Sequence, residues 1–196
     1  MYERSDRIAL FDHYAACLGP VTRNWNMRTI PKEELRVFGF DGAPEPGCSV
    51  LCTFGLSDHC LHAPGARDGA RLEYLFSVSA ACDAGKIAAL LLAIGAHALE
   101  KRYSPGVHGV LEGKGAVLFE GNPRFEHFYL ASPIGLPTDL AVCGTVAPST
   151  GIVQLIPVSS EEKRFIDTRG WQAFERLLRT ARVDLSLFDG REEVVA

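Results

Sequence analysis

A serine, an aspartate and a histidine stand side by side in the segment Gly55-Leu-Ser57-Asp-His59, and these residue types form the catalytic relay of many hydrolases. The segment begins like the Gly-x-Ser-x-Gly turn that exposes a nucleophilic serine. However, His59 occupies the place of the second glycine, which must permit the tight turn. Three consecutive side chains also cannot stack into a relay by themselves. Hydrolysis at this loop is therefore kept only as an alternative function.

The same region is rich in sulfur and imidazole, the ligands that suit zinc. Cys48 and Cys52 lie four residues apart at the start of an expected strand, which separates their Cα atoms by roughly 13 Å and prevents both from binding one ion. The set that remains is His59, Cys60 and His62, and it defines a metal-dependent enzyme as a weak alternative. We expect neither a metal nor another cofactor.

Charge and hydropathy limit the partners. The chain has 196 residues, with 20 Lys and Arg against 24 Asp and Glu, so its formal net charge is −4. This balance would not neutralise a run of phosphates, and nucleic acid is not an expected partner. The longest apolar run, residues 88–96, is far shorter than the roughly 20 residues that span a membrane. Together with a charged start that lacks a secretory signal, this predicts a cytoplasmic protein with no membrane partner.

Apolar periodicity indicates the elements that position these residues in the first half of the chain. Ser5 or Asp6 can cap a first helix that ends at Gly19-Pro20. The residues expected to face the core from this helix are Ile8, Phe11, Ala15 and Leu18. Strands are predicted over residues 35–40, 49–54 and 71–79, and Asp83 can cap a second, deeply buried helix that runs to about Arg102.

The second half predicts further strands and two more helices. The expected strands cover residues 116–119, 125–131, 140–146 and 152–157. A capping box, Ser159-Ser-Glu-Glu162, opens a third helix, Gly170 can close it, and a fourth helix runs from Trp171 to about Ala181. Because strands and helices are grouped in runs, we predict a single α+β domain over residues 1–188. Its mixed or mostly antiparallel sheet would pack against about four helices, with an acidic, disordered tail at 189–196.

Two structural roles are expected around the Ser57 loop. Gly55 follows a strand and permits a turn, while Ser57 and Asp58 are short polar side chains that can bond nearby backbone amides, so the loop is predicted to be rigid and self-capped. Glu73 lies on a strand otherwise rich in large apolar residues and faces away from them. It is expected at the surface or beside a basic residue, without a catalytic role.

Several segments follow one another in a characteristic order along the chain. They are His13-Tyr14 with Leu18-Gly19-Pro20, residues 31–37, Thr53-Phe-Gly-Leu-Ser-Asp-His59, Leu72-Glu73-Tyr74, Ser104-Pro-Gly-Val-His108, and Val153-Gln-Leu-Ile-Pro-Val158 followed by Glu161-Glu162. This order resembles the suppressor of fused domain family, especially its bacterial members. The resemblance spans residues 5 to 182, while the region from Leu111 to Thr150 matches only loosely.

This resemblance implies a non-enzymatic domain that binds another protein. Many bacterial relatives look like immunity proteins encoded beside polymorphic toxins, and a net charge of −4 suits a basic partner. The expected partner-binding residues are Ser57, Asp58 and His59, with the exposed sides of the terminal helices, such as that of Glu175, as a second candidate face. No catalytic residue is expected.

Overall fold

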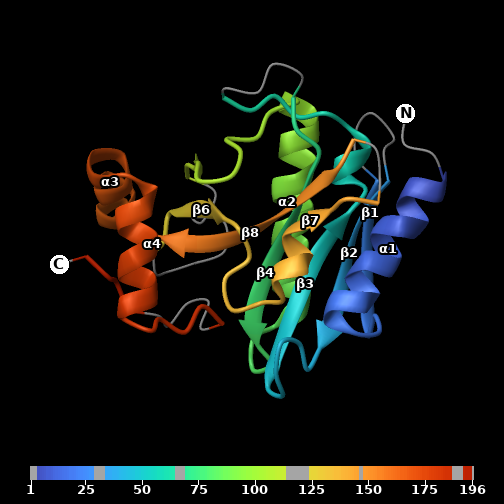
Figure 1. Ribbon diagram of the computed structural model, residues 1–196, viewed down its shortest axis with the longest axis horizontal. Helices are drawn as coiled ribbons and strands as arrows, with labels where there is room; N and C mark the ends of the chain where they lie inside the picture. Colours follow the sequence, from blue (N-terminus) through green and yellow to red (C-terminus); the bar gives the residue numbers. More distant parts are fainter. Residues whose placement is uncertain are drawn as a thin grey trace.

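A mixed sheet of eight strands forms the centre of the computed structural model, which describes residues 4–28, 34–64, 69–113, 124–145, 148–186 and 192–195 (Figure 1). The strands are β1 (Arg23–Arg28), β2 (Glu34–Asp41), β3 (Cys48–Phe54), β4 (Leu72–Ser79), β5 (Val110–Leu111), β6 (His127–Ala131), β7 (Val142–Cys143) and β8 (Thr150–Val158). Their order is β1-β2-β3-β4-β8-β6-β5, and β7 pairs with β8 beside this path. The β4–β8 pair is parallel, whereas the other pairs are antiparallel.

Four helices cover the two faces of this sheet. They are α1 (Arg4–Leu18), α2 (Ala84–Lys101), α3 (Ser160–Arg169) and α4 (Trp171–Thr180), and short 3-10 turns occur at η1 (Leu56–Asp58) and η3 (Thr138–Ala141). Helix α2 packs on one face, while α1 packs on the other over the β2–β4 half. The α3–α4 hairpin lies at the far end of the molecule from α1 and packs on β6 and β8 (Figure 1). The structure is therefore the α+β domain with a mixed sheet that the sequence predicted.

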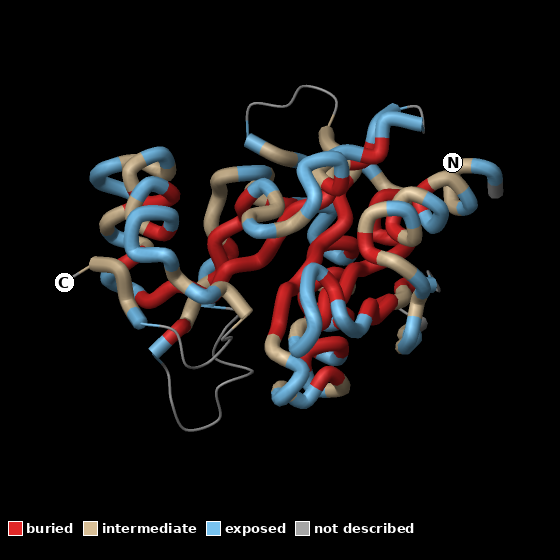
Figure 2. The backbone as a smooth tube through the Cα atoms, turned by 60° about the horizontal axis from the view of Figure 1, so that its bottom comes forward, coloured by how far each residue is buried: buried red, intermediate tan, exposed pale blue. Residues whose placement is uncertain are grey.

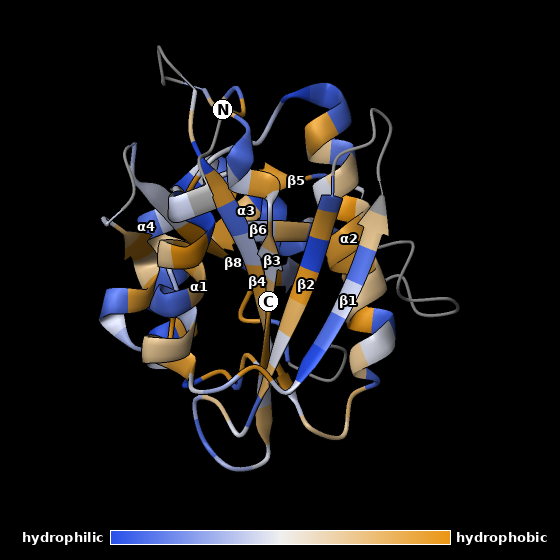
Figure 3. Cartoon of the chain, turned by 90° about the vertical axis from the view of Figure 1, so that its right-hand side faces the viewer, coloured by the Kyte–Doolittle hydropathy of each residue, from blue (hydrophilic) through white to orange (hydrophobic). Residues whose placement is uncertain are grey.

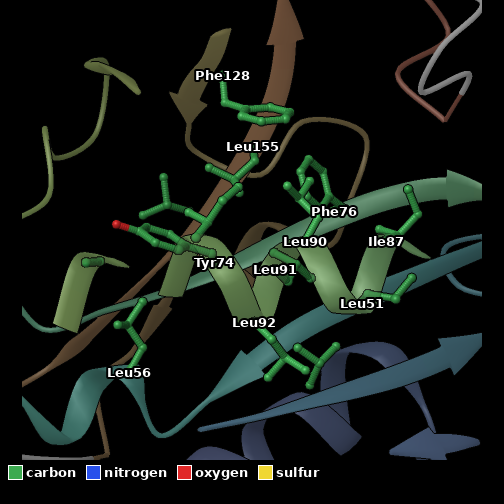
Figure 4. Close-up of a cluster of buried hydrophobic side chains, with 14 of the residues drawn as sticks. Leu51, Leu56, Tyr74, Phe76, Ile87, Leu90, Leu91, Leu92, Phe128 and Leu155 are labelled. Carbon is green, nitrogen blue, oxygen red and sulfur yellow. The ribbon is translucent and has the colours of Figure 1, made fainter. Parts of the chain in front are cut away.

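Alternation along the central strands explains why both faces are buried. On β4, Tyr74 and Phe76 point to α2, whereas Leu75 between them points to the α1 side. The α2 side holds the largest cluster, where Leu90 and Leu91 meet Tyr74, Phe76 and the strands beyond (Figure 4). A strand buried on both faces reads as a nearly continuous apolar run, which is how residues 71–79 appear in the sequence.

Local capping signals fix the helix ends where they were expected. The Asp83 carboxylate accepts from the amides of Gly85 and Lys86, at 2.9 and 3.2 Å, and so begins α2. Ser159 and Glu162 form the predicted capping box of α3. Gly170, with φ of 84°, ends α3 and directly precedes α4.

The face that α1 buries differs from the prediction. Leu10, Tyr14 and Leu18 point into the core, whereas Ile8 is 56% exposed and Phe11 is 39% exposed. Figure 2 shows exposed, intermediate and buried stretches alternating along this first helix. Of the stripe expected to be buried, only Leu18 is fully covered. The helix carries two apolar stripes of similar spacing, and the sheet that α1 meets decides which one is covered.

Three strand predictions also need comment. Strand β1 was not predicted, because its sequence Arg-Asn-Trp-Asn-Met-Arg is mostly polar. Residues 140–146 were expected to form one strand, but the described part, 140–145, contains the end of η3 and the two-residue β7. The strand expected at 116–119 lies outside the described residues. Within the acidic tail, the Val194 amide donates to Glu162 at 3.0 Å, and the disorder of 189–196 stays a prediction.

Candidate functional site

A buried glutamate organises the loop that follows β3. Glu73 on β4 is completely buried and accepts four hydrogen bonds from that loop and the strand before it. Oε1 accepts from the Gly55 amide at 3.0 Å, the Ser57 amide at 3.0 Å and the Ser57 hydroxyl at 2.7 Å. Oε2 accepts from the Thr53 hydroxyl at 2.6 Å, and that hydroxyl in turn accepts from the Tyr74 amide. One carboxylate thus holds the backbone in place from the end of β3 at residue 53 to residue 57.

The backbone of this loop is suited to only a few residue types. Gly55 has φ of 108°, in the region that L-residues rarely adopt, and a Cβ there would lie 2.7 Å from the carbonyl oxygen of Glu34. The next three residues form the 3-10 turn η1. The predicted turn at Gly55 is therefore present. Two features favour glycine there: the positive φ angle and the close approach to the β2 backbone.

The environment of Glu73 contradicts its predicted surface position. Burial raises the pKa of the Glu73 carboxyl above its ordinary value, and the hydrogen bonds from Thr53, Ser57 and Gly55 oppose that shift only in part. Its partners are hydroxyl and amide groups rather than a basic residue. Glu73 does face away from Tyr74 and Phe76, as expected, but that second face of β4 is also covered.

A salt bridge ties the loop to α1. Arg7 on α1 donates to Asp58 Oδ2, with Nε at 3.0 Å, and its guanidinium lies 6.0 Å from the centre of the Phe54 ring. The hydrogen bond that Arg7 donates to the Asp58 carboxylate raises the pKa of Arg7. The loop was predicted to cap itself through Ser57 and Asp58, and this is wrong: Ser57 bonds to Glu73, Asp58 bonds to Arg7, and Arg71 donates to the Ser57 carbonyl at 3.2 Å.

The predicted site residues thus differ in accessibility. Ser57 is fully buried, the Asp58 side chain is 13% exposed, and His59 is half-buried. The Ser57 hydroxyl donates to a carboxylate and not to an imidazole, so the arrangement of a nucleophile beside its general base is not formed here. Of the three, only Asp58 and His59 retain some solvent exposure.

The weak metal set is spread along an extended segment. Cys60 and His62 are exposed, and the backbone of His62 exchanges hydrogen bonds with Arg102 and Ser104 after α2. Among the described residues, no group of three or more His, Cys, Asp or Glu side chains could hold a metal ion. In the same part of the chain, no helix is both long and apolar enough to cross a membrane.

A second polar cluster joins α4 to the sheet. The His108 ring stacks on Trp171 with centroids 3.5 Å apart, and His108 Nδ1 lies 3.0 Å from the Tyr129 hydroxyl. Tyr129 donates to Glu175 at 2.9 Å, and burial together with that carboxylate raises the pKa of Tyr129. Glu175 is therefore buried at the α4–sheet contact, which corrects its expected place on an exposed helix face.

Sequence reasoning missed Glu73 and Arg7 as parts of this site. An acidic residue in the middle of a continuous apolar strand was a usable signal for Glu73, because a strand buried on both faces leaves a carboxylate only internal partners. Nothing local indicated Arg7, which meets Asp58 from 51 positions away.

Comparison with known proteins gives this arrangement a context. The family model described as suppressor of fused protein (SUFU) matches residues 31–189. A crystal structure of a SUFU homologue from Neisseria gonorrhoeae is similar with a TM-score of 0.75 and 14% identity, covering 99% of both chains. The Sufu–Fu complex matches with a TM-score of 0.64 and 14% identity, covering 97% of this chain and 91% of the other.

Drosophila Suppressor of Fused matches with a TM-score of 0.58 and 14% identity, covering 96% of this chain and 50% of the Drosophila chain. No curated protein matches the chain. The structural similarities, at 14% identity, concern the fold, and the family model covers most of the sequence, including the whole loop around Glu73. The chain therefore belongs to the suppressor of fused family.

Proposed function

We propose that this protein is a non-enzymatic domain that binds another protein, and that its partner is a toxin encoded nearby, which it neutralises as an immunity protein. The observation that carries the first part is the use of Glu73. Its carboxylate and the Ser57 hydroxyl bond to each other and to the backbone, so they hold a loop in one shape and are not free for chemistry. Family membership supports the same role, since a related structure is described as the Sufu–Fu complex.

The face that we propose for binding is formed by the accessible part of the loop and the start of α1. Asp58 lies there beside Arg7, and His59 follows it in the chain. The anchored backbone beneath them needs no reordering when a partner arrives. A preformed surface loses less conformational entropy on association than a mobile one. The net charge of −4 supports a basic partner, because opposite charges raise the association rate.

The decisive experiment measures binding to the purified product of the neighbouring gene. We expect Asp58→Lys to slow association about tenfold at low salt, because it reverses a charge at the proposed face. The double variant Arg7→Asp/Asp58→Lys restores an ion pair between α1 and the loop. Because this variant also restores the summed charge of the pair, association should recover if that charge sets the rate. It should stay slow if the partner recognises the carboxylate at position 58 itself.

A matched variant tests the second candidate face. Glu161 on α3 is exposed and paired with Arg164, so Glu161→Lys also reverses one acidic charge within a surface ion pair. We expect it to leave association unchanged. If Glu161→Lys slows binding while Asp58→Lys does not, the partner docks on the terminal helices instead. If the neighbouring product does not bind at all, the toxin assignment fails.

A further inference from the structure

The outer edge of β1 is a surface that the proposed function does not use. β1 is the first strand in the sheet order and pairs with β2 on one side, and no described residue pairs with its other side. Figure 3 shows β1 beside β2 at the margin of the sheet, with α2 behind it. The strand has six residues and no proline, so its outer edge can accept another strand.

The register shows which backbone groups point outward. The Gly42 amide donates to the Cys48 carbonyl, so the alternating residues Phe40, Phe38 and Arg36 bond to β3. Gly39 and Val37 therefore face β1, in agreement with the Gly39 carbonyl, which accepts from Thr22.

In β1, the residues opposite Gly39 and Val37 are Arg23 and Trp25, which bond to β2. The amides and carbonyls of Asn24 and Asn26 consequently point away from the sheet. Asn24 and Asn26 thus each present a backbone donor and acceptor in the spacing of a strand ladder.

The side chains of β1 separate into two faces. Trp25 and Met27 are half-buried against the α2 cluster, and the Trp25 ring lies over Gly39, 3.2 Å from where a Cβ would stand. Asn24 and Asn26 are exposed on the opposite face. The edge thus offers an aromatic ring on one side and uncharged amides on the other.

We propose that β1 pairs with β1 of a second copy of this chain, antiparallel and centred on Trp25. In this register, Asn24 of each copy lies opposite Asn26 of the other, and these pairs exchange both backbone hydrogen bonds. Trp25 meets Trp25 at the position without backbone bonds, where side chains approach most closely, and aromatic cross-strand pairs stabilise a sheet. Side chains that lie directly opposite each other in an antiparallel pair point to the same face of the sheet. Since Trp25 points to the α2 side in each copy, both α2 helices lie on one face of the joined sheet.

Charge and shape also favour a second copy over an unrelated strand. Arg23 lies opposite Met27 in this register, so the two Arg23 side chains are not opposed, and each is already paired with Asp41 at 2.8 Å. Helix α2 packs mainly over β2 and β3, and Trp25 on β1 is only half-buried, so part of each Trp25 ring can meet the other. Binding of a toxin is not required, so this inference can stand or fall separately from the proposed function.

The test is the mass of the purified chain in sedimentation as its concentration is raised. We expect a reversible monomer–dimer equilibrium that approaches about twice the 21.3 kDa of one chain. Asn24→Lys/Asn26→Lys places like charges opposite each other at both paired positions and should weaken the dimer at least about tenfold. Asn24→Lys/Asn26→Glu places opposite charges there and should restore it. Both positions are exposed, and equal unfolding temperatures would show that the fold is unchanged.

A backbone variant provides an independent check. Asn26→Pro removes an outward amide without removing a bond to β2 and should give a monomer, while Asn26→Ala keeps that amide and should remain dimeric. A wild-type chain that stays monomeric at every concentration would overturn the proposal. So would a dimer that is insensitive to Asn24→Lys/Asn26→Lys, or one that Asn24→Lys/Asn26→Glu fails to restore, because the register would then be wrong.

Discussion

The Glu73 carboxylate is buried and accepts hydrogen bonds from four donors. Removing the carboxylate would leave buried donors without an acceptor, and removing the donors would leave a buried carboxylate without hydrogen bonds. Burial of a charged group is unfavourable unless hydrogen bonds compensate it, and here each bond also fixes a segment of backbone. The stability of the loop and the protonation of one residue are therefore linked.

We expect Glu73→Ala to lower the free energy of unfolding by about 3 kcal/mol, because it leaves the Gly55 and Ser57 amides and two hydroxyls without their buried acceptor. Glu73→Gln should be much milder. The amide oxygen can accept at the Oε1 position, while the amide nitrogen can donate to the Thr53 hydroxyl. Urea unfolding of both variants measures this, and equal losses in the two would contradict the proposed role of the acceptor.

The raised pKa of Glu73 predicts a definite sign of pH dependence. A folded-state value above the unfolded one, near 4.5, means that the folded chain holds this proton more tightly. The contribution to stability is then complete below about pH 4.5 and is lost as pH rises through the folded-state value. The unfolding free energy of the wild type, relative to Glu73→Gln, should fall between acidic and neutral pH. Urea titrations of both proteins across that range test it, and an increase would reverse the assignment.

Helix α1 shows how an element is placed by its partner rather than by its own pattern. We expect Leu10→Ala to reduce the free energy of unfolding by about 3 kcal/mol, since it opens a cavity between α1 and the sheet. Ile8→Ala, on the exposed stripe, should change it by less than about 0.5 kcal/mol. Chemical denaturation distinguishes the two, and the reverse ranking would mean that the sequence-predicted face is the buried one.

Elements with strong local signals were predictable, and elements defined by distant contacts were not. Asp83 and the Ser159–Glu162 pair bond to backbone within three residues, so the sequence alone indicates where α2 and α3 begin. Strand β1 lies at an edge of the sheet and is mostly polar, so its sequence carries no clear apolar alternation. It is a strand because it pairs with β2, and that contact is not visible in the sequence of β1 itself. In the site, the Gly55 turn was predictable, whereas the Arg7–Asp58 bridge depends on how α1 packs.

Across the whole molecule, β8 joins three apolar clusters into one unit. Ile152 packs with α1, Val153 and Leu155 pack with α2, and Ile156 packs with α3 and α4. Because each cluster shares this strand, we expect a single cooperative transition on heating. Calorimetry should give matching calorimetric and van't Hoff enthalpies, and two separated transitions would refute the assignment of one domain.

The parallel β4–β8 pair also has a consequence for synthesis on the ribosome. Strands β1, β2 and β3 each pair with the next strand in sequence, so β1 to β4 can assemble as they emerge. In contrast, Leu72 on β4 finds its second neighbour only when Gly151 has been translated. Until then the nascent chain presents the open side of β4, a strand whose residues are buried almost throughout in the finished protein. A chain truncated before Thr150 would expose the unpaired edge of the apolar strand β4, and this edge favours aggregation or binding by chaperones.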